Sequence, residues 1–91
     1  MSKKRDRLEV IYDILNTVRN NKNNIKPTPL LRYSNLSSQR FAEYYSELIN
    51  KQLIRESEDK KGKKFITLTD SGFKYLEKYK TIIGFIEEFD L

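Results

Sequence analysis

The chain has 91 residues, and its 18 Lys and Arg against 13 Asp and Glu give a formal net charge of +5. It contains no histidine and no cysteine, which removes the imidazole base, the thiolate nucleophile and the thiolate zinc site that many enzymes use. We therefore expect one small domain that is not an enzyme and needs no metal or cofactor, and the basic charge favours a polyanionic partner.

No segment resembles a membrane span or an export signal. No stretch approaches the roughly 20 apolar residues that a transmembrane helix needs, and no apolar run follows the basic start Met1–Arg5. The expected location is the cytoplasm. The hydrophobic fraction is only 37%, so the core is expected to be thin and to gain buried surface from oligomerisation.

The first predicted element is an amphipathic helix from Arg5 to about Asn20. Its apolar residues recur at spacings of three and four, as on the buried face of a helix. They are Leu8, Ile11, Tyr12, Leu15 and Val18. The asparagine-rich segment 20–24 ends this helix, because asparagine favours turns.

A short second helix is predicted over 27–33, with Thr28 as its N-cap and Pro29 at its first position. Asn35 suits the left-handed conformation of the turn that follows.

The third predicted helix runs from Ser38 to about Lys51, with Ser37 as its cap. Its core side consists of Phe41, Tyr45, Leu48 and Ile49, with Tyr44 beside them. Two helices joined by a short turn form a helix-turn-helix pattern, which many small helical proteins also contain.

A β-hairpin is predicted directly after this pattern. The stretches 53–57 and 64–68 suit short strands, and Gly62 in the intervening "EDKKGKK" (58–64) supplies the freedom that a tight turn needs. Helix, helix-turn-helix and hairpin follow in the order of a winged helix, in which this segment is the tip of the wing. Its lysines are either phosphate contacts or a solvated turn, since Glu58 and Asp59 offset two of their charges.

The last predicted helix opens at the cap Thr69 and reaches Phe89, with Leu68 and Phe73 placed for a hydrophobic staple. One apolar stripe, suited to the domain core, consists of Phe73, Leu76 and Ile83. A second stripe on the opposite side has the spacing of a coiled-coil seam. It consists of Tyr75, Tyr79, Ile82, Ile86 and Phe89.

The second stripe predicts a homodimer. Lysines lie toward the start of this helix and carboxylates toward its end, so an antiparallel partner sets opposite charges against each other. The alternative is that Tyr75 and Tyr79 only flank the core and that the end of the helix frays, because two heptads are short for a coiled coil.

Several short stretches together resemble a known family. They are Lys3–Arg5, Leu8–Leu15, Asn35–Ser37, the run 44–48 that leads into Gln52–Ile54, and Leu68–Gly72. In this order they are similar to small archaeal winged-helix proteins, a family that includes the ten-kilodalton Sulfolobus chromatin protein and predicted transcriptional regulators. The resemblance covers nearly the whole chain. It implies a dimeric DNA-binding protein joined through an antiparallel coiled coil of C-terminal helices.

The chain departs from the family pattern at three places. An aromatic residue common at position 32 is displaced to Tyr33, a glycine usual before Leu53 is replaced by Gln52, and the final helix is shorter than in the chromatin protein. The last difference puts the size of the dimer contact in question.

In a winged helix the start of the third helix enters the major groove. There Gln39 suits adenine and Arg40 suits guanine. Glu43 either accepts from cytosine or, with Glu47, repels phosphate, in which case these are ordinary solvent-facing residues. The predicted DNA contacts are Arg32, Ser37, Ser38, Gln39, Arg40, Glu43, the wing residues Lys60, Lys61, Lys63 and Lys64, and the N-terminal residues Lys3, Lys4 and Arg5.

The sequence thus predicts a mainly α winged helix-turn-helix protein with a small hairpin. A DNA-binding domain is expected over 1–69 and a dimerisation helix over 70–91. The expected function is double-stranded DNA binding as a homodimer, as a transcriptional regulator or a nucleoid-associated protein. A winged helix that binds only proteins is the main alternative, and RNA binding is a weaker one because no aromatic strand platform is evident.

Overall fold

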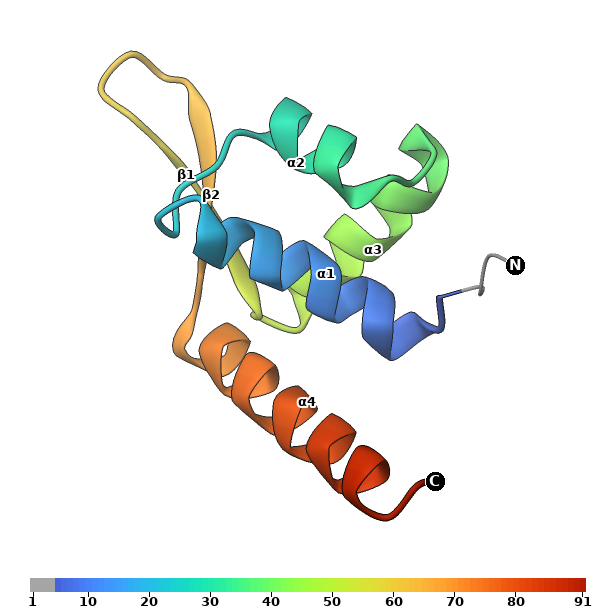
Figure 1. The fold of residues 1–91 in the computed structure, drawn as a ribbon. Helices are drawn as coiled ribbons and strands as arrows, with labels where there is room; N and C mark the ends of the chain where they lie inside the picture. Colours follow the sequence, from blue (N-terminus) through green and yellow to red (C-terminus); the bar gives the residue numbers. More distant parts are fainter. Residues whose placement is uncertain (1–4) are drawn as a thin grey trace.

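The architecture is a winged helix with a long final helix (Figure 1), here a computed structural model that describes residues 5–91. The elements in chain order are α1 (Arg7–Asn20), α2 (Pro27–Ser34), α3 (Ser38–Asn50), β1 (Ile54–Glu58), β2 (Lys64–Leu68) and α4 (Asp70–Glu88). The predicted fold class is confirmed. None of the helices in the described part of the chain is both long and apolar enough to cross a bilayer.

The hairpin is antiparallel, and Ile54 pairs with Leu68 while Glu58 pairs with Lys64. Ile25 adds a single bridge to the other side of β2, where its backbone exchanges hydrogen bonds of 3.2 and 2.7 Å with Ile66. This bridge was not predicted from the sequence, because one paired residue between two helices produces no alternating pattern. It ties the chain between α1 and α2 to the hairpin.

Three helices begin with a side-chain cap. The carboxylate of Asp6 accepts from the N–H of Glu9 at 2.8 Å, the hydroxyl of Ser37 accepts from Arg40 at 3.2 Å, and that of Thr69 accepts from Gly72 at 3.1 Å. The caps at Ser37 and Thr69 are as predicted. The cap at Asp6 makes α1 begin at Arg7, two residues later than expected.

The start of α2 was predicted incorrectly. The helix begins at Pro27, and its N-cap Lys26 makes no side-chain cap hydrogen bond. Proline fits the first helical position because its φ is already helical and it has no N–H to satisfy. Pro27 therefore takes the position expected for Pro29, and Thr28 lies inside the helix.

Two left-handed residues set the turns on either side of α3. Asn35 has φ 58°, as expected, and Gln52 has φ 59°. Gln52 is the position at which the family resemblance expects glycine. A non-glycine residue in this region costs about 1 kcal/mol or more, so glutamine adopts here a conformation for which glycine is better suited.

The core lies between α1, the two helices of the helix-turn-helix and the hairpin. The fully buried large side chains include Ile14, Leu15, Leu30, Leu48, Ile66 and Leu76. On α1, Val10 and Ile14 are buried, whereas the predicted core residue Leu8 is 51% exposed. Ile11, Leu15 and Val18 are buried as predicted, so the buried stripe keeps most of the expected residues and extends to Val10 and Ile14 instead of Leu8.

The first half of α4 packs on α1. Leu76 is buried, the ring of Tyr79 stacks on Tyr12 at 4.6 Å, and the hydroxyl of Tyr75 donates to the carbonyl of Leu8 at 2.9 Å. Burial raises the pKa of Tyr75 to about 12. The expectation that Tyr75 and Tyr79 lie on the side away from the core is therefore wrong. Phe73, expected to face the core, is 38% exposed instead.

The two glycines of α4 provide a stability prediction. A Cβ on Gly72 would lie 2.3 Å from the carbonyl oxygen of Leu53, whereas one on Gly84 meets nothing within 4 Å. Gly72→Ala is expected to lower the free energy of unfolding by about 1–3 kcal/mol. Gly84→Ala is expected to raise it by about 0.5–1 kcal/mol. Thermal unfolding followed by circular dichroism tests both, and a Gly72→Ala variant as stable as wild type contradicts the packing described.

Candidate nucleic-acid interface

The N-terminal end of α3 is open to solvent, as a helix that enters a DNA groove requires. All five side chains predicted to face DNA there are exposed; they are Ser37, Ser38, Gln39, Arg40 and Glu43. The guanidinium of Arg40 lies 6.0 Å from the centre of the Tyr44 ring, within cation–π range. Tyr44 therefore supports an arginine that projects from this surface.

One of the two carboxylates expected to repel phosphate is neutralised within the protein. The guanidinium of Arg7 donates to both carboxylate oxygens of Glu47, and the ammonium of Lys51 lies 3.3 Å from the same group. Within residues 5–91, Glu43 has no such ion pair. The negative charge beside the start of α3 is thus reduced to one carboxylate.

Arg32 lies at the end of α2 and is exposed. Its guanidinium is 5.9 Å from the centre of the ring of Tyr33, which is itself 59% exposed. The displaced aromatic residue noted in the sequence thus lies beside Arg32 at the surface.

The wing tip is an ordered turn that carries exposed lysines. One carboxylate oxygen of Asp59 accepts from the N–H groups of Lys61 and Lys63 at 2.8 and 2.9 Å, and the Asp59 carbonyl accepts from Gly62 at 2.9 Å. Gly62 has φ 78°, which L side chains rarely adopt. The side chains of Lys60, Lys61, Lys63 and Lys64 are all exposed.

Lys64 differs from the other wing lysines. Its ammonium lies 3.5 Å from Glu56, whose carboxylate also accepts a hydrogen bond from the hydroxyl of Tyr45 on α3. Burial and the hydrogen bond to Glu56 together raise the pKa of Tyr45 well above its usual value, which keeps the hydroxyl protonated as a donor. The charge of Lys64 is therefore partly neutralised by Glu56, whereas the other three lysines project from the turn.

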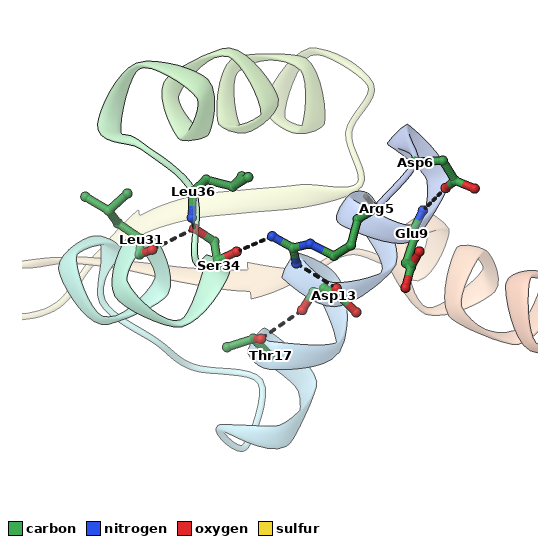
Figure 2. Close-up of polar contacts among 8 residues, drawn as sticks. All are labelled: Arg5, Asp6, Glu9, Asp13, Thr17, Leu31, Ser34 and Leu36. Carbon is green, nitrogen blue, oxygen red and sulfur yellow. Dashed lines mark hydrogen bonds and ion pairs between the residues drawn. The ribbon is translucent and has the colours of Figure 1, made fainter. Parts of the chain in front are cut away.

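Arg5 makes structural contacts. Its guanidinium donates to the carboxylate of Asp13 and to the carbonyl of Ser34, each at 2.8 Å (Figure 2). The hydroxyl of Ser34 in turn donates to the carbonyl of Leu31 at 2.6 Å. Arg5 thus joins the start of α1 to the end of α2, a role that was not predicted from the sequence. Lys3 and Lys4, predicted to belong to the same basic arm, lie outside the described residues.

An apolar surface covers the distal half of α4. We call it the distal patch; it consists of Ile82, Phe85, Ile86 and Phe89, with exposures of 52, 56, 38 and 57%. The rings of Phe85 and Phe89 lie 4.8 Å apart. Phe85 was not in the predicted seam, although its spacing of three from Ile82 and four from Phe89 places it on the same face.

No obvious metal site exists in the described part of the chain. Within residues 5–91, no group of three or more carboxylates is arranged to hold a metal ion. An open depression of about 550 Å³ lies between the end of α3, β1 and the start of α4, where Arg55 and Asp70 line it.

Comparison with solved structures finds the same fold in proteins of low sequence identity. The PcaV transcriptional regulator from Streptomyces coelicolor has a TM-score of 0.74 at 20% identity over 87% of this chain, which spans 59% of PcaV. Sso10a-2, a DNA-binding protein from Sulfolobus solfataricus, has a TM-score of 0.74 at 18% identity over 93% of this chain and 85% of its own. F93 from STIV, a winged-helix DNA-binding protein, has a TM-score of 0.72 at 23% identity, with 88% and 91% covered.

A comparison with curated protein sequences gives no match. The sequence profile of the winged helix-turn-helix family, in contrast, matches residues 4–87, which include both strands and the four helices except Glu88, the last residue of α4. The profile match and the observed order of elements agree: the chain belongs to the winged helix-turn-helix family.

Proposed function

We propose that this protein binds double-stranded DNA as a homodimer, with the start of α3 in the major groove and the wing on an adjacent phosphate backbone. The observation that carries the proposal is the wing tip. The carboxylate of Asp59 accepts hydrogen bonds from two backbone N–H groups of the turn. Lys60, Lys61 and Lys63 project into solvent from this ordered turn. Three neighbouring cations on a protruding turn suit a row of phosphates.

The exposed start of α3 suits base contacts. Arg40 is the candidate for a bidentate contact with guanine and Gln39 for one with adenine. Glu43 suits the amino group of cytosine. Ser37, Ser38 and Arg32 border this surface and suit phosphate oxygens. The ion pairs that neutralise Glu47 support this arrangement, because they lower the repulsion that a duplex meets there.

The distal patch supports a homodimer through α4. Four large apolar side chains are exposed on one face of α4 in a chain of only 91 residues. Such an apolar face commonly marks a protein contact. An antiparallel pair also sets Lys74, Lys78 and Lys80 against Glu87, Glu88 and Asp90. In functional terms, residues 1–69 are then the DNA-binding part and 70–91 the dimerisation helix.

The biological role that fits is a transcriptional regulator or a nucleoid-associated protein in the cytoplasm, without catalytic activity and without a cofactor. Relatives of the same fold include a transcriptional regulator and two DNA-binding proteins.

The test is duplex binding measured by fluorescence anisotropy over a range of salt concentrations. If about six cations per protomer contact phosphates, log K is expected to fall with log salt at a slope near −5 per protomer, from about −0.9 for each contact. Binding that does not change between low and moderate salt contradicts the proposal and favours a protein-binding winged helix.

A further inference from the structure

A side-chain bridge joins α3 to the hairpin. The hydroxyl of Tyr45 donates to one carboxylate oxygen of Glu56 on β1, and the other oxygen lies 3.5 Å from the ammonium of Lys64 on β2. One carboxylate oxygen of Glu56 thus contacts α3, and the other contacts β2. Among residues 5–91, no other side-chain hydrogen bond or ion pair connects α3 to either strand.

Two shallow surface depressions flank the bridge. A shallow depression of about 320 Å³, lined by Phe41 and Ala42, lies on one side of it, and another of about 300 Å³, lined by Ile49, lies on the other. Tyr45 and Glu56 line both depressions. Depressions therefore flank the bridge, whereas Leu48 of α3 and Ile54 and Ile66 of the hairpin belong to one buried core. The bridge adds a directional polar contact to this apolar packing.

The helix end of the bridge is firmly held. The ring of Tyr45 lies 5.7 Å from that of Phe41, which is only 7% exposed and belongs to the core. The strand end is held by the pairing of β1 with β2, in which Glu56 lies opposite the fully buried Ile66. Because both of its ends are held, the hydrogen bond between Tyr45 and Glu56 couples the position of the hairpin to that of α3.

We propose that Tyr45 and Glu56 are positioning residues that fix the angle between α3 and the wing, so that both elements reach one duplex at the same time. The inference rests on the proposed function, since it matters only if α3 and the wing contact the same DNA. Neither residue has to touch DNA. Loss of the bridge weakens binding because the wing must then be ordered when the complex forms.

The test is Tyr45→Phe, which keeps the ring against Phe41 and removes only the hydroxyl. Duplex affinity is expected to fall about three- to tenfold, the range for losing one hydrogen bond of ordinary net strength. The same change is then made in a tip variant in which Lys60, Lys61 and Lys63 are serine. There Tyr45→Phe is expected to have no further effect, because the wing no longer contributes contacts that need positioning.

Residual dipolar couplings of the free protein measure the angle between α3 and the hairpin directly, without DNA. They are expected to change in Tyr45→Phe and not in Tyr12→Phe, the matched control that loses a phenol hydroxyl on α1. Unchanged couplings in Tyr45→Phe, or an equal loss of affinity with and without the tip lysines, overturns the inference. If the wild type does not bind duplex DNA, the proposed function fails, and the couplings still decide whether the bridge sets the angle.

Discussion

Replacing Lys60, Lys61, Lys63 and Lys64 together by serine is expected to weaken duplex binding by a similar factor for every DNA sequence. Each lysine that contacts a phosphate releases one counterion, so the slope of log K against log salt is expected to shrink by about one for each phosphate that the variant no longer neutralises. Since Lys64 is paired with Glu56 whereas the other three project from the turn, most of the change is expected from those three. Anisotropy titrations over a series of salt concentrations measure it.

The four-serine variant is expected to unfold at nearly the wild-type temperature, because three of the lysines are solvent-exposed charges at a loop tip and an exposed ion pair such as Lys64–Glu56 contributes at most about 1 kcal/mol. Arg40→Ala serves as the matched contrast. It is expected to reduce the difference between preferred and random DNA by roughly 1–3 kcal/mol, because a bidentate base contact discriminates between sequences. Wild-type affinity and an unchanged salt slope in the four-serine variant would show that the lysines form only a solvated turn.

Placing a carboxylate in the distal patch is expected to produce folded monomers. In Ile82→Glu or Ile86→Glu, each protomer loses about 1.5–3 kcal/mol of apolar burial, and both protomers of a symmetric dimer carry the change. The dimer dissociation constant is therefore expected to rise by about 100-fold or more. Sedimentation equilibrium measures it, with the wild type at twice the chain mass of 10.9 kDa.

Phe73→Glu is the control for this experiment, since Phe73 is an exposed aromatic residue of the same helix that lies outside the distal patch. It is expected to leave the mass of the dimer unchanged. Circular dichroism confirms that each variant is folded. A wild-type protein that stays monomeric at high concentration would exclude the distal patch as a dimer contact.

The order of helices and the hairpin was predictable from the sequence, because each depends on local signals. Ser37 and Thr69 stand directly before apolar stripes, and Gly62 stands between two β-prone runs. These signals act over a few residues, so they can be recognised in the sequence without knowledge of the fold. The start of α2 was harder, because Pro27 and Pro29 both suit a first helical position.

Contacts between distant residues were not predictable. The bonds from Arg5 to Ser34 and from Arg7 to Glu47 join residues 29 and 40 positions apart, and no local pattern distinguishes these arginines from DNA contacts. The rotation of α4 was missed for the same reason. The spacing of its apolar residues defines two stripes, but only the packing on α1 shows that Leu76 of one stripe and Tyr75 and Tyr79 of the other all face the protein.

The hydrogen bonds of Asp59 have a consequence for the thermodynamics of binding. Asp59 lowers the net positive charge of the wing. Its carboxylate, however, holds the backbone at Lys61 and Lys63 in one conformation. A loop already shaped before the encounter gives up less conformational entropy when it settles on a phosphate backbone. If the wing contacts DNA as proposed, this negative charge lowers the electrostatic attraction but also lowers the entropy cost of binding. A variant that lacks the Asp59 carboxylate is therefore not expected to bind DNA more tightly, although its net charge is higher.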